Sequence, residues 1–189
     1  MKIVNETKLD FDDILLVPQR SMAASRKDVN LNRTFNFYHS TKDWQGTPII
    51  AANMDTTGSF AMGAELSKYG CITCLHKHND PDKIVDYFKY YNIEPYAWIS
   101  VGMPKDRNKT LDQLHHIEKG VHYAPNICID IANGYTDKFC EWCSLVRKKF
   151  PESIIMAGNV CTPEMVQELI LHGGWSWLGN IHKTCLNIH

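Results

Sequence analysis

The sequence has almost no net charge and no long apolar run, and both absences exclude classes of function. Its 20 basic and 21 acidic residues give a formal net charge of −1 over 189 residues. Electrostatics therefore gives no support for binding to nucleic acid or to an anionic membrane. No apolar run approaches the roughly 18–20 residues of a membrane-spanning helix. Residues 1–10 contain no apolar stretch of the secretory type, so we expect a cytosolic protein whose seven cysteines are reduced thiols.

The sequence also lacks a G-x-G-x-x-G fingerprint after its first predicted strand, which argues against a Rossmann dinucleotide-binding unit. What is present is a series of short apolar runs that predict strands buried on both faces, as in a parallel sheet. The five predicted strands are residues 47–53, 71–75, 96–101, 126–132 and 153–157. Helix-start signals lie between them, such as Asp80-Pro81 and Thr162-Pro163.

The predicted strands recur at the spacing of a βα unit, about 25–30 residues. A complete (β/α)₈ barrel takes about 250 residues, which is more than this chain contains. We therefore predict the N-terminal part of a (β/α)₈ TIM barrel, with about five of its eight βα units. The predicted divisions are an N-terminal extension (1–46), a partial barrel (47–174) and a tail (175–189). An unusual five-stranded sheet is the alternative.

Polar side chains gather where each predicted strand ends. The segments are Asn53-Met54-Asp55, His76-Lys77-His78, Ser100-Val101-Gly102, Asp130-Ile131-Ala132-Asn133 and Gly158-Asn159. Barrel active sites lie at this face, because the carboxyl ends of the strands meet there. Amide and carboxylate groups bind sugar hydroxyls, and a lysine neutralises an anion or relays a proton. The pattern therefore predicts a site for a polar ligand.

Each of these residues has an alternative interpretation in which it serves structure alone. Asp130 can cap the following helix, Lys77 can be a solvated loop charge, and Asn53 and Asn159 can form turns.

We predict no metal site, because no cysteine or histidine pair at zinc-finger spacing accompanies His76 and His78. The pairs Cys71/Cys74 and Cys140/Cys143 are interpreted as buried thiols.

Several long segments together resemble the IMP dehydrogenase/GMP reductase family, over residues 1–174. The segments are residues 9–16 (LDFDDILL), 48–56 (PIIAANMDT), 76–78 (HKH), 128–135 (CIDIANGY) and 156–160 (MAGNV). The reductase branch fits better than the dehydrogenase branch. Dehydrogenases of the family usually carry two inserted CBS modules after the second strand, whereas here His78 leads directly into the helix that begins at Pro81.

The resemblance implies a (β/α)₈ barrel that uses NADPH to convert GMP to IMP and ammonia. In the family a cysteine attacks the purine C2, ammonia leaves and a hydride is transferred, so that covalent catalysis divides a difficult displacement into two steps. The family is usually a homotetramer, and a monovalent cation such as K⁺ often orders the cysteine loop.

The resemblance also implies roles for individual residues. The proposed catalytic and cofactor network contains Lys77 and Asp130, and the nicotinamide contact is made by Asp130, Ile131 and Ala132. The purine and ribose pocket is lined by Met54 and Asn159. The residues that would reach NADPH bound to a neighbouring subunit are Ser25 and Arg26, although the pair alone is typical of an exposed polar turn.

The sequence departs from the family after Gly174, where residues 175–189 match nothing. The nucleophilic cysteine loop and the cation-binding carbonyls have no counterpart there, and Cys185 lacks the flanking glycines that would place it over the site. A reading-frame shift, an alternative exon or a gene-model error would explain this tail. We therefore expect this chain alone to be inactive. Alternatives are a non-catalytic partner of full-length reductase subunits, a nucleotide-binding fragment and an IMP dehydrogenase.

A barrel that stops after five strands leaves its first and fifth strands with unpaired edges. We therefore expect the isolated chain to aggregate, to fold partly or to depend on a partner.

Overall fold

The computed structural model describes residues 5, 7, 9 and 11–178, and the chain divides into two compact units. The first unit, up to Asn30, contains two 3-10 turns, Phe11–Asp13 and Arg26–Asp28. Ser25 caps the second turn. Its Oγ accepts a hydrogen bond from the Lys27 N–H at 3.3 Å, and the Asp28 carboxylate accepts one from the Ser25 N–H at 2.8 Å.

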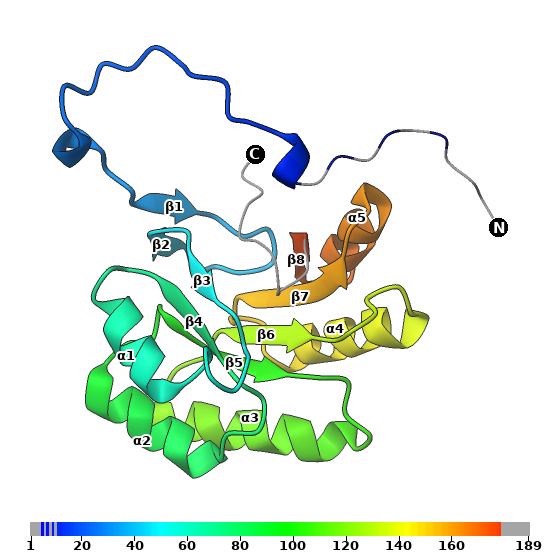
Figure 1. The fold of residues 1–189 in the computed structure, drawn as a ribbon. Coiled ribbons are helices and arrows are strands. Elements are labelled where there is room, and N and C mark those ends of the chain that lie inside the picture. Colours follow the sequence, from blue (N-terminus) through cyan, green and yellow to red (C-terminus); the bar gives the residue numbers. More distant parts are fainter. Residues whose placement is uncertain (1–4, 6, 8, 10, 179–189) are drawn as a thin grey trace. The chain divides into compact units, whose positions relative to one another are not determined.

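The second unit begins at Leu31 and contains a parallel six-stranded sheet in the order β3-β4-β5-β6-β7-β8 (Figure 1). Its strands are β3 (Ile50–Ala51), β4 (Ile72–Leu75), β5 (Ala97–Val101), β6 (Ile127–Asp130), β7 (Ile155–Val160) and β8 (Trp175–Leu178). The helices between successive strands are α1 (Phe60–Ser67), α2 (Pro81–Tyr91), α3 (Arg107–Val121), α4 (Asp137–Lys149) and α5 (Pro163–Leu171). Five βα units in sequence form part of a TIM barrel, which confirms the predicted fold class.

The helix starts follow the local signals in the sequence. Asp80 caps α2, because its Oδ1 accepts hydrogen bonds from the backbone N–H groups of Asp82 and Lys83, and Pro81 is the first helical residue. A proline fits there because the first N–H of a helix has no intrahelical partner. Helix α5 begins in the same way, with Thr162 at the N-cap position and Pro163 as the first helical residue, but the Thr162 side chain makes no capping hydrogen bond.

Strand boundaries differ from the prediction at both ends of the sheet. The first strand is only two residues long, because Pro48 has no N–H to donate and the Ile49 N–H turns back to the Thr47 carbonyl at 2.7 Å. The fifth predicted strand extends to Val160 instead of ending at residue 157.

The expectation that the fifth strand has an unpaired edge is wrong. Residues 175–178, which match nothing in the resemblance, form β8 and pair with β7 in parallel register, with an irregularity between Ala157 and Val160. The backbone of any extended segment supplies the N–H and C=O groups that an edge strand lacks, whatever its side chains. The rest of the predicted tail, including Cys185, lies outside the described residues.

A short antiparallel hairpin, β1 (Arg33–Phe35) and β2 (Trp44–Gly46), belongs to the second unit. The Nε1 of Trp44 donates a hydrogen bond to the Pro95 carbonyl at 2.8 Å, just before β5 begins. The hairpin therefore lies against the amino ends of the parallel strands. The division at residue 46 into an extension and a barrel stays a prediction.

Alternate residues of each parallel strand face opposite sides of the sheet, and each side has its own core. One side packs against the helices through residues that include Leu75, Ile99, Ile127, Ile129 and Ile155. The other side forms a smaller cluster that includes Cys74, Trp98, Cys128 and Met156, together with Trp44 of the hairpin. This second side is the interior of the partial barrel.

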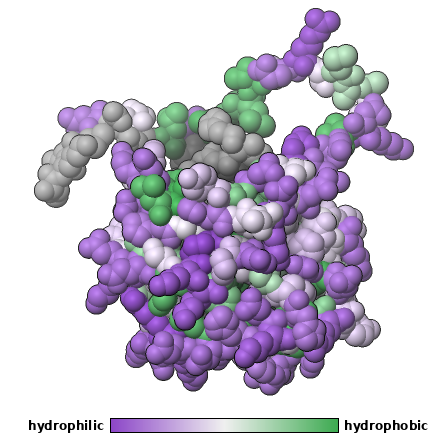
Figure 2. Space-filling view, turned by 180° about the vertical axis from the view of Figure 1, so that it is seen from behind, coloured by the Kyte–Doolittle hydropathy of each residue, from purple (hydrophilic) through white to green (hydrophobic). Residues whose placement is uncertain are grey.

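The outside of the second unit is mostly hydrophilic in the view from behind, with hydrophobic side chains in small groups (Figure 2). Amphipathic helices produce such a surface, because their apolar faces are buried against the sheet. Among the described residues, no helix combines the length and the apolar character needed to cross a membrane.

Two buried tryptophans allow a matched test of the core. Trp98 and Trp142 are both fully buried. The Nε1 of Trp98 donates to the Pro95 carbonyl at 3.2 Å, whereas the Nε1 of Trp142 has no hydrogen-bond partner in the described part of the chain. Because one substitution loses a hydrogen bond and the other does not, Trp98→Phe should lower the free energy of unfolding by about 1 kcal/mol more than Trp142→Phe. Urea unfolding measures both, and equal losses would contradict the core described here.

Candidate functional site

A pocket of about 470 Å³ lies at the carboxyl ends of β3, β4, β6 and β7. Its lining residues are Asn53, Met54, Asp55, His76, Lys77, His78, Asp130, Ile131, Ala132 and Asn159. The structure thus brings together all six site residues that the sequence indicated between positions 54 and 159. Segments that are far apart in the sequence meet here because parallel strands end at the same edge of a sheet.

Asp130 reaches the pocket because of its place in the strand register. Within β6 it follows Cys128 by two residues and so faces the same side, and it pairs with Gly158 on β7. The inner face is apolar at Cys128 and turns polar at Asp130, where the strand ends. Asp130 does not cap α4, which begins at Asp137 after Thr136, so the capping alternative is wrong.

A hydrogen bond joins two of the strand-end residues across the pocket. The Asn53 Nδ2 donates to the Asp130 Oδ2 at 3.0 Å. Asn53 follows β3 and Asp130 ends β6, so the contact spans the width of β4 and β5. Asn53 is therefore more than a turn former: its amide is a neutral donor placed beside a carboxylate.

Lys77 lies in a short loop after β4 that is held by hydrogen bonds on both sides. The His76 N–H donates to the Gly58 carbonyl at 3.1 Å, and the Asn79 side-chain amide donates to the His76 carbonyl at 3.0 Å. The His78 N–H donates to the His76 Nδ1 at 3.2 Å. These bonds restrict the loop from which Lys77 extends.

The side chain of Lys77 runs over Gly102 at the end of β5. A Cβ at Gly102 would lie 3.6 Å from the Lys77 Nζ and 3.7 Å from the backbone oxygen of Asp130. The lysine head and the end of β6 therefore approach the same small volume. An ammonium group and a carboxylate that line the same pocket provide one donor and one acceptor for a polar ligand.

The loops after β6 and β7 are bonded to each other at the rim of the pocket. The Gly134 N–H donates to the Asn159 carbonyl at 3.1 Å, and the Cys161 N–H donates to the Tyr135 hydroxyl at 2.8 Å. Gly134 has no space for a side chain, since a Cβ there would lie 2.6 Å from the Asn159 carbonyl oxygen. These contacts fix where Asn159 stands relative to Asp130.

A family comparison identifies what kind of domain carries this pocket. The model of the IMP dehydrogenase / GMP reductase domain matches residues 8–175. The chain belongs to this family.

The curated relatives agree with this assignment. Human GMP reductase 1 is 44% identical over 173 residues, which are 91% of this chain and 49% of that protein. GMP reductase from Aliivibrio fischeri (strain MJ11) is 43% identical over 176 residues, covering 92% of this chain and 50% of the relative. The chain therefore spans about half the length of the curated relatives that it matches.

A solved structure supports the fold independently. Inosine 5′-monophosphate dehydrogenase from Legionella pneumophila has a TM-score of 0.69 at 24% sequence identity, over 87% of this chain and 48% of that one. At this identity the likeness concerns the fold alone. The match, which covers about half of that structure, is consistent with a partial barrel.

Two of the predicted site residues, Ser25 and Arg26, lie in the first unit. They belong to an exposed 3-10 turn, whose hydrogen bonds are local. Their role at a neighbouring subunit stays a prediction.

Other contacts were missed by sequence reasoning. No sequence pattern indicated the Tyr135–Cys161 contact, apart from the position of Tyr135 in a segment that resembles the family. The hydrogen bond from His78 to the His76 ring depends on a turn that residue spacing does not specify.

The cysteines fall into a buried group and an exposed one. The pairs Cys71/Cys74 and Cys140/Cys143 are buried, as predicted from the sequence. Cys161 is exposed. Burial raises the pKa of the Cys143 thiol to about 12. Residues 11–178 contain no cluster of three or more metal-ligating side chains.

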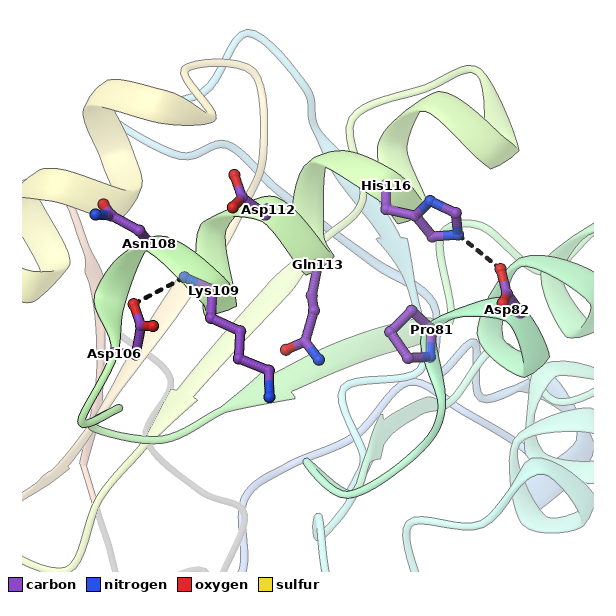
Figure 3. Close-up of a pocket in the computed structure, with 8 residues that line it drawn as sticks. All are labelled: Pro81, Asp82, Asp106, Asn108, Lys109, Asp112, Gln113 and His116. Atoms are coloured by element: carbon purple, nitrogen blue, oxygen red, sulfur yellow. Dashed lines mark hydrogen bonds and ion pairs between the residues drawn. The ribbon is translucent and has the colours of Figure 1, made fainter.

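A second hollow, of about 530 Å³, lies between α2 and α3 and contains none of the strand-end residues. The His116 Nε2 and the Asp82 Oδ1 are 2.6 Å apart and join the two helices, while Lys109 and Gln113 extend from α3 (Figure 3). Both partners of this ion pair are more than half exposed, so the pair contributes little to stability. The strand-end pocket is the better candidate, because Lys77, Asp130 and the two asparagines converge there.

The loop contacts predict a contrast between two glycines. A Cβ at Gly58 would lie 2.3 Å from the Cys74 carbonyl oxygen, whereas a Cβ at Gly102 would make ordinary contacts. Gly58→Ala should therefore lower the free energy of unfolding by about 1–3 kcal/mol, and Gly102→Ala should change it by less than about 0.5 kcal/mol. Thermal denaturation compares the two, and equal tolerance would contradict the close approach of β4 to the loop after β3.

Cysteine chemistry provides a second prediction. Because the thiolate is the reactive form, exposed Cys161 should be alkylated by iodoacetamide in the native protein while Cys143 stays unmodified. Raising the pH from 8 to 10 should not change this for Cys143, since its pKa of about 12 keeps the thiol protonated throughout that range. Peptide mapping by mass spectrometry distinguishes the sites. Equal labelling of both cysteines in the folded chain would show that α4 is not packed as described.

Proposed function

We propose that this chain is the N-terminal, nucleotide-binding part of a GMP reductase, the NADPH-dependent enzyme that converts GMP to IMP and ammonia. The observation that carries the proposal is the convergence of Lys77, Asp130 and Asn159 on one pocket at the carboxyl edge of the sheet. The family and the relatives named GMP reductase support it. The direct passage from β4 to α2, with no inserted module, favours the reductase branch over the dehydrogenase branch.

The pocket suits a nucleotide in size and in chemistry. Its volume of about 470 Å³ lies within the range of about 300–1,000 Å³ that is typical of small-molecule sites. Asp130 is an acceptor for ribose hydroxyls, and Lys77 is a donor for an anionic or carbonyl oxygen. Met54, which is 41% exposed, offers an apolar surface for a flat base.

The residues take the following roles in this proposal. Asp130, Ile131 and Ala132 hold the nicotinamide side of NADPH, and Met54 and Asn159 line the purine and ribose pocket. Lys77 and Asp130 bind the polar groups next to the reacting carbon and exchange a proton with the departing amine. NADPH, when bound, supplies the hydride.

Ser25 and Arg26 contact NADPH bound to a neighbouring subunit in the homotetramer of the family.

The 189 residues contain no segment that matches the cysteine loop of the family, and so we propose that the chain alone binds nucleotide without turning it over. Cys161, the exposed cysteine of the described chain, engages the hydroxyl of Tyr135 instead (Sγ to oxygen 3.2 Å). In the alternative proposal, the chain joins full-length reductase subunits as a non-catalytic partner.

Nucleotide binding is tested by thermal shift. GMP and NADPH should each raise the melting temperature of the 189-residue chain, because a ligand that binds only the folded state stabilises it. The shift should become much smaller in Asp130→Ala and in Lys77→Ala. It should persist in Asp112→Ala, which removes an exposed carboxylate of α3 outside the pocket. Equal shifts in all three variants would show that the ligand binds elsewhere.

Turnover is tested by the oxidation of NADPH followed at 340 nm. The chain alone should show no GMP-dependent oxidation, because no cysteine among the described residues lines the pocket. Oxidation that is lost in Lys77→Ala would show that a nucleophile is present, and Cys161 and Cys185 would be replaced next to find it.

A further inference from the structure

The hydrogen bond between Asn53 and Asp130 does more than join two strand ends. Asn53 lies two residues beyond β3, and its Nδ2 meets the Asp130 Oδ2 at 3.0 Å. Only the carboxylate can accept here, since an amide N–H₂ has no lone pair to offer. The bond occupies one carboxylate oxygen, and no donor in the described part of the chain is bonded to the other oxygen, Oδ1.

We propose that Asn53 is a positioning residue, which holds the Asp130 carboxylate so that its second oxygen binds a donor group of the ligand. The inference rests on the proposed function, in which the ligand is a nucleotide and the donor is a hydroxyl of its ribose. An aspartate carboxylate can rotate about the Cα–Cβ and Cβ–Cγ bonds into several orientations, and a fixed hydrogen bond selects one of them. Preorganisation of this kind improves binding because the ordering cost is met before the ligand arrives.

The surroundings show why an amide is suited to this position. The other charged or titratable side chains that line the pocket are Asp55, His76, Lys77 and His78. A lysine at position 53 would form an ion pair with Asp130 and add a second ammonium group to the pocket that Lys77 lines. An aspartate at position 53 would place two carboxylates about one hydrogen-bond length apart, and they would repel each other or share a proton. The amide donates without adding charge.

The same bond also ties the end of β3 to the end of β6 across two intervening strands. A purely structural role would therefore explain the contact equally well. The experiment must separate the stability of the fold from the orientation of the carboxylate.

The first measurement is the affinity for NADPH, followed by its fluorescence, in three variants of the 189-residue chain. Asn53→Leu keeps the size of the side chain and removes the donor, and it should weaken binding about tenfold, as expected for the loss of a hydrogen bond to a charged group. Asn53→Asp should weaken binding further. Asn108→Leu, on the exposed surface of α3, is the matched control and should bind like the original chain.

A double-mutant cycle and melting temperatures identify the mechanism. If Asn53 acts through Asp130, Asn53→Leu should have no further effect on affinity in the Asp130→Ala background. A merely structural role predicts that the affinity falls only as far as the fold is destabilised, so the melting temperatures of Asn53→Leu and Asn108→Leu are compared first. The inference requires a tenfold loss of affinity at similar melting temperatures.

A spectroscopic signature tests the contact without any nucleotide. One side-chain amide proton of Asn53 should resonate downfield of the other side-chain amides, because it is bonded to a carboxylate, and Asp130→Ala should abolish this shift. Unchanged amide signals in Asp130→Ala would overturn the inference.

The binding data separate the two proposals. Binding that is lost in Asp130→Ala but kept in Asn53→Leu would overturn the positioning role and leave the proposed function standing. NADPH binding that is unchanged in both variants would overturn the positioning role and the proposed site together.

Discussion

The pocket exists because the parallel strands run in one direction with a fixed register. Cys74 is level with Trp98, Ser100 with Cys128, and Asp130 with Gly158, so each layer of the inner face contains one residue from each of several strands. The layers near the amino ends are apolar and are packed against the hairpin. The layer at the carboxyl ends is polar, and residues of the loops that follow β3, β4, β6 and β7 line the pocket there. A shift of one residue in any strand would turn its polar end toward the helices.

Within that polar layer, short contacts determine where each functional group stands. Asn53 holds Asp130, and the hydrogen bonds around His76 hold the loop that carries Lys77. Glycines at positions 58 and 134 let backbone segments approach where a side chain would collide. A carboxylate, an amide and an ammonium group are thus presented from different strands with little freedom to move apart. Such restraint favours binding, because little conformational entropy is then lost when the ligand orders these side chains.

The sequence predicted the parts of the fold that depend on local signals. Asp80-Pro81 marked the start of α2, and the buried apolar runs marked five of the parallel strands, because capping and burial are properties of short segments. The strand-end residues Lys77 and Asp130 were predicted to meet, since parallel strands leave no other edge for them. Their chemical roles were implied by resemblance alone and stay proposals.

Other features depend on three-dimensional distances that a sequence does not contain. The partner of Asp130 is Asn53, which follows a strand three positions away in the sheet, and no local signal in either segment indicates this contact. The sixth strand arises from residues 175–178, whose pairing with β7 uses backbone groups that every residue has. Pro48 shortened the first strand by removing one donor, a local effect that the apolar run concealed.

We propose that the carboxyl ends of β3, β4, β6 and β7 form one nucleotide site. Hydrogen–deuterium exchange of the 189-residue chain with and without GMP and NADPH tests it most directly. Nucleotide bound at this site should slow exchange in the segments around residues 53–55, 76–79, 130–135 and 158–161, with no change in the hollow between α2 and α3. Protection confined to α2 and α3, or no protection anywhere, would contradict it.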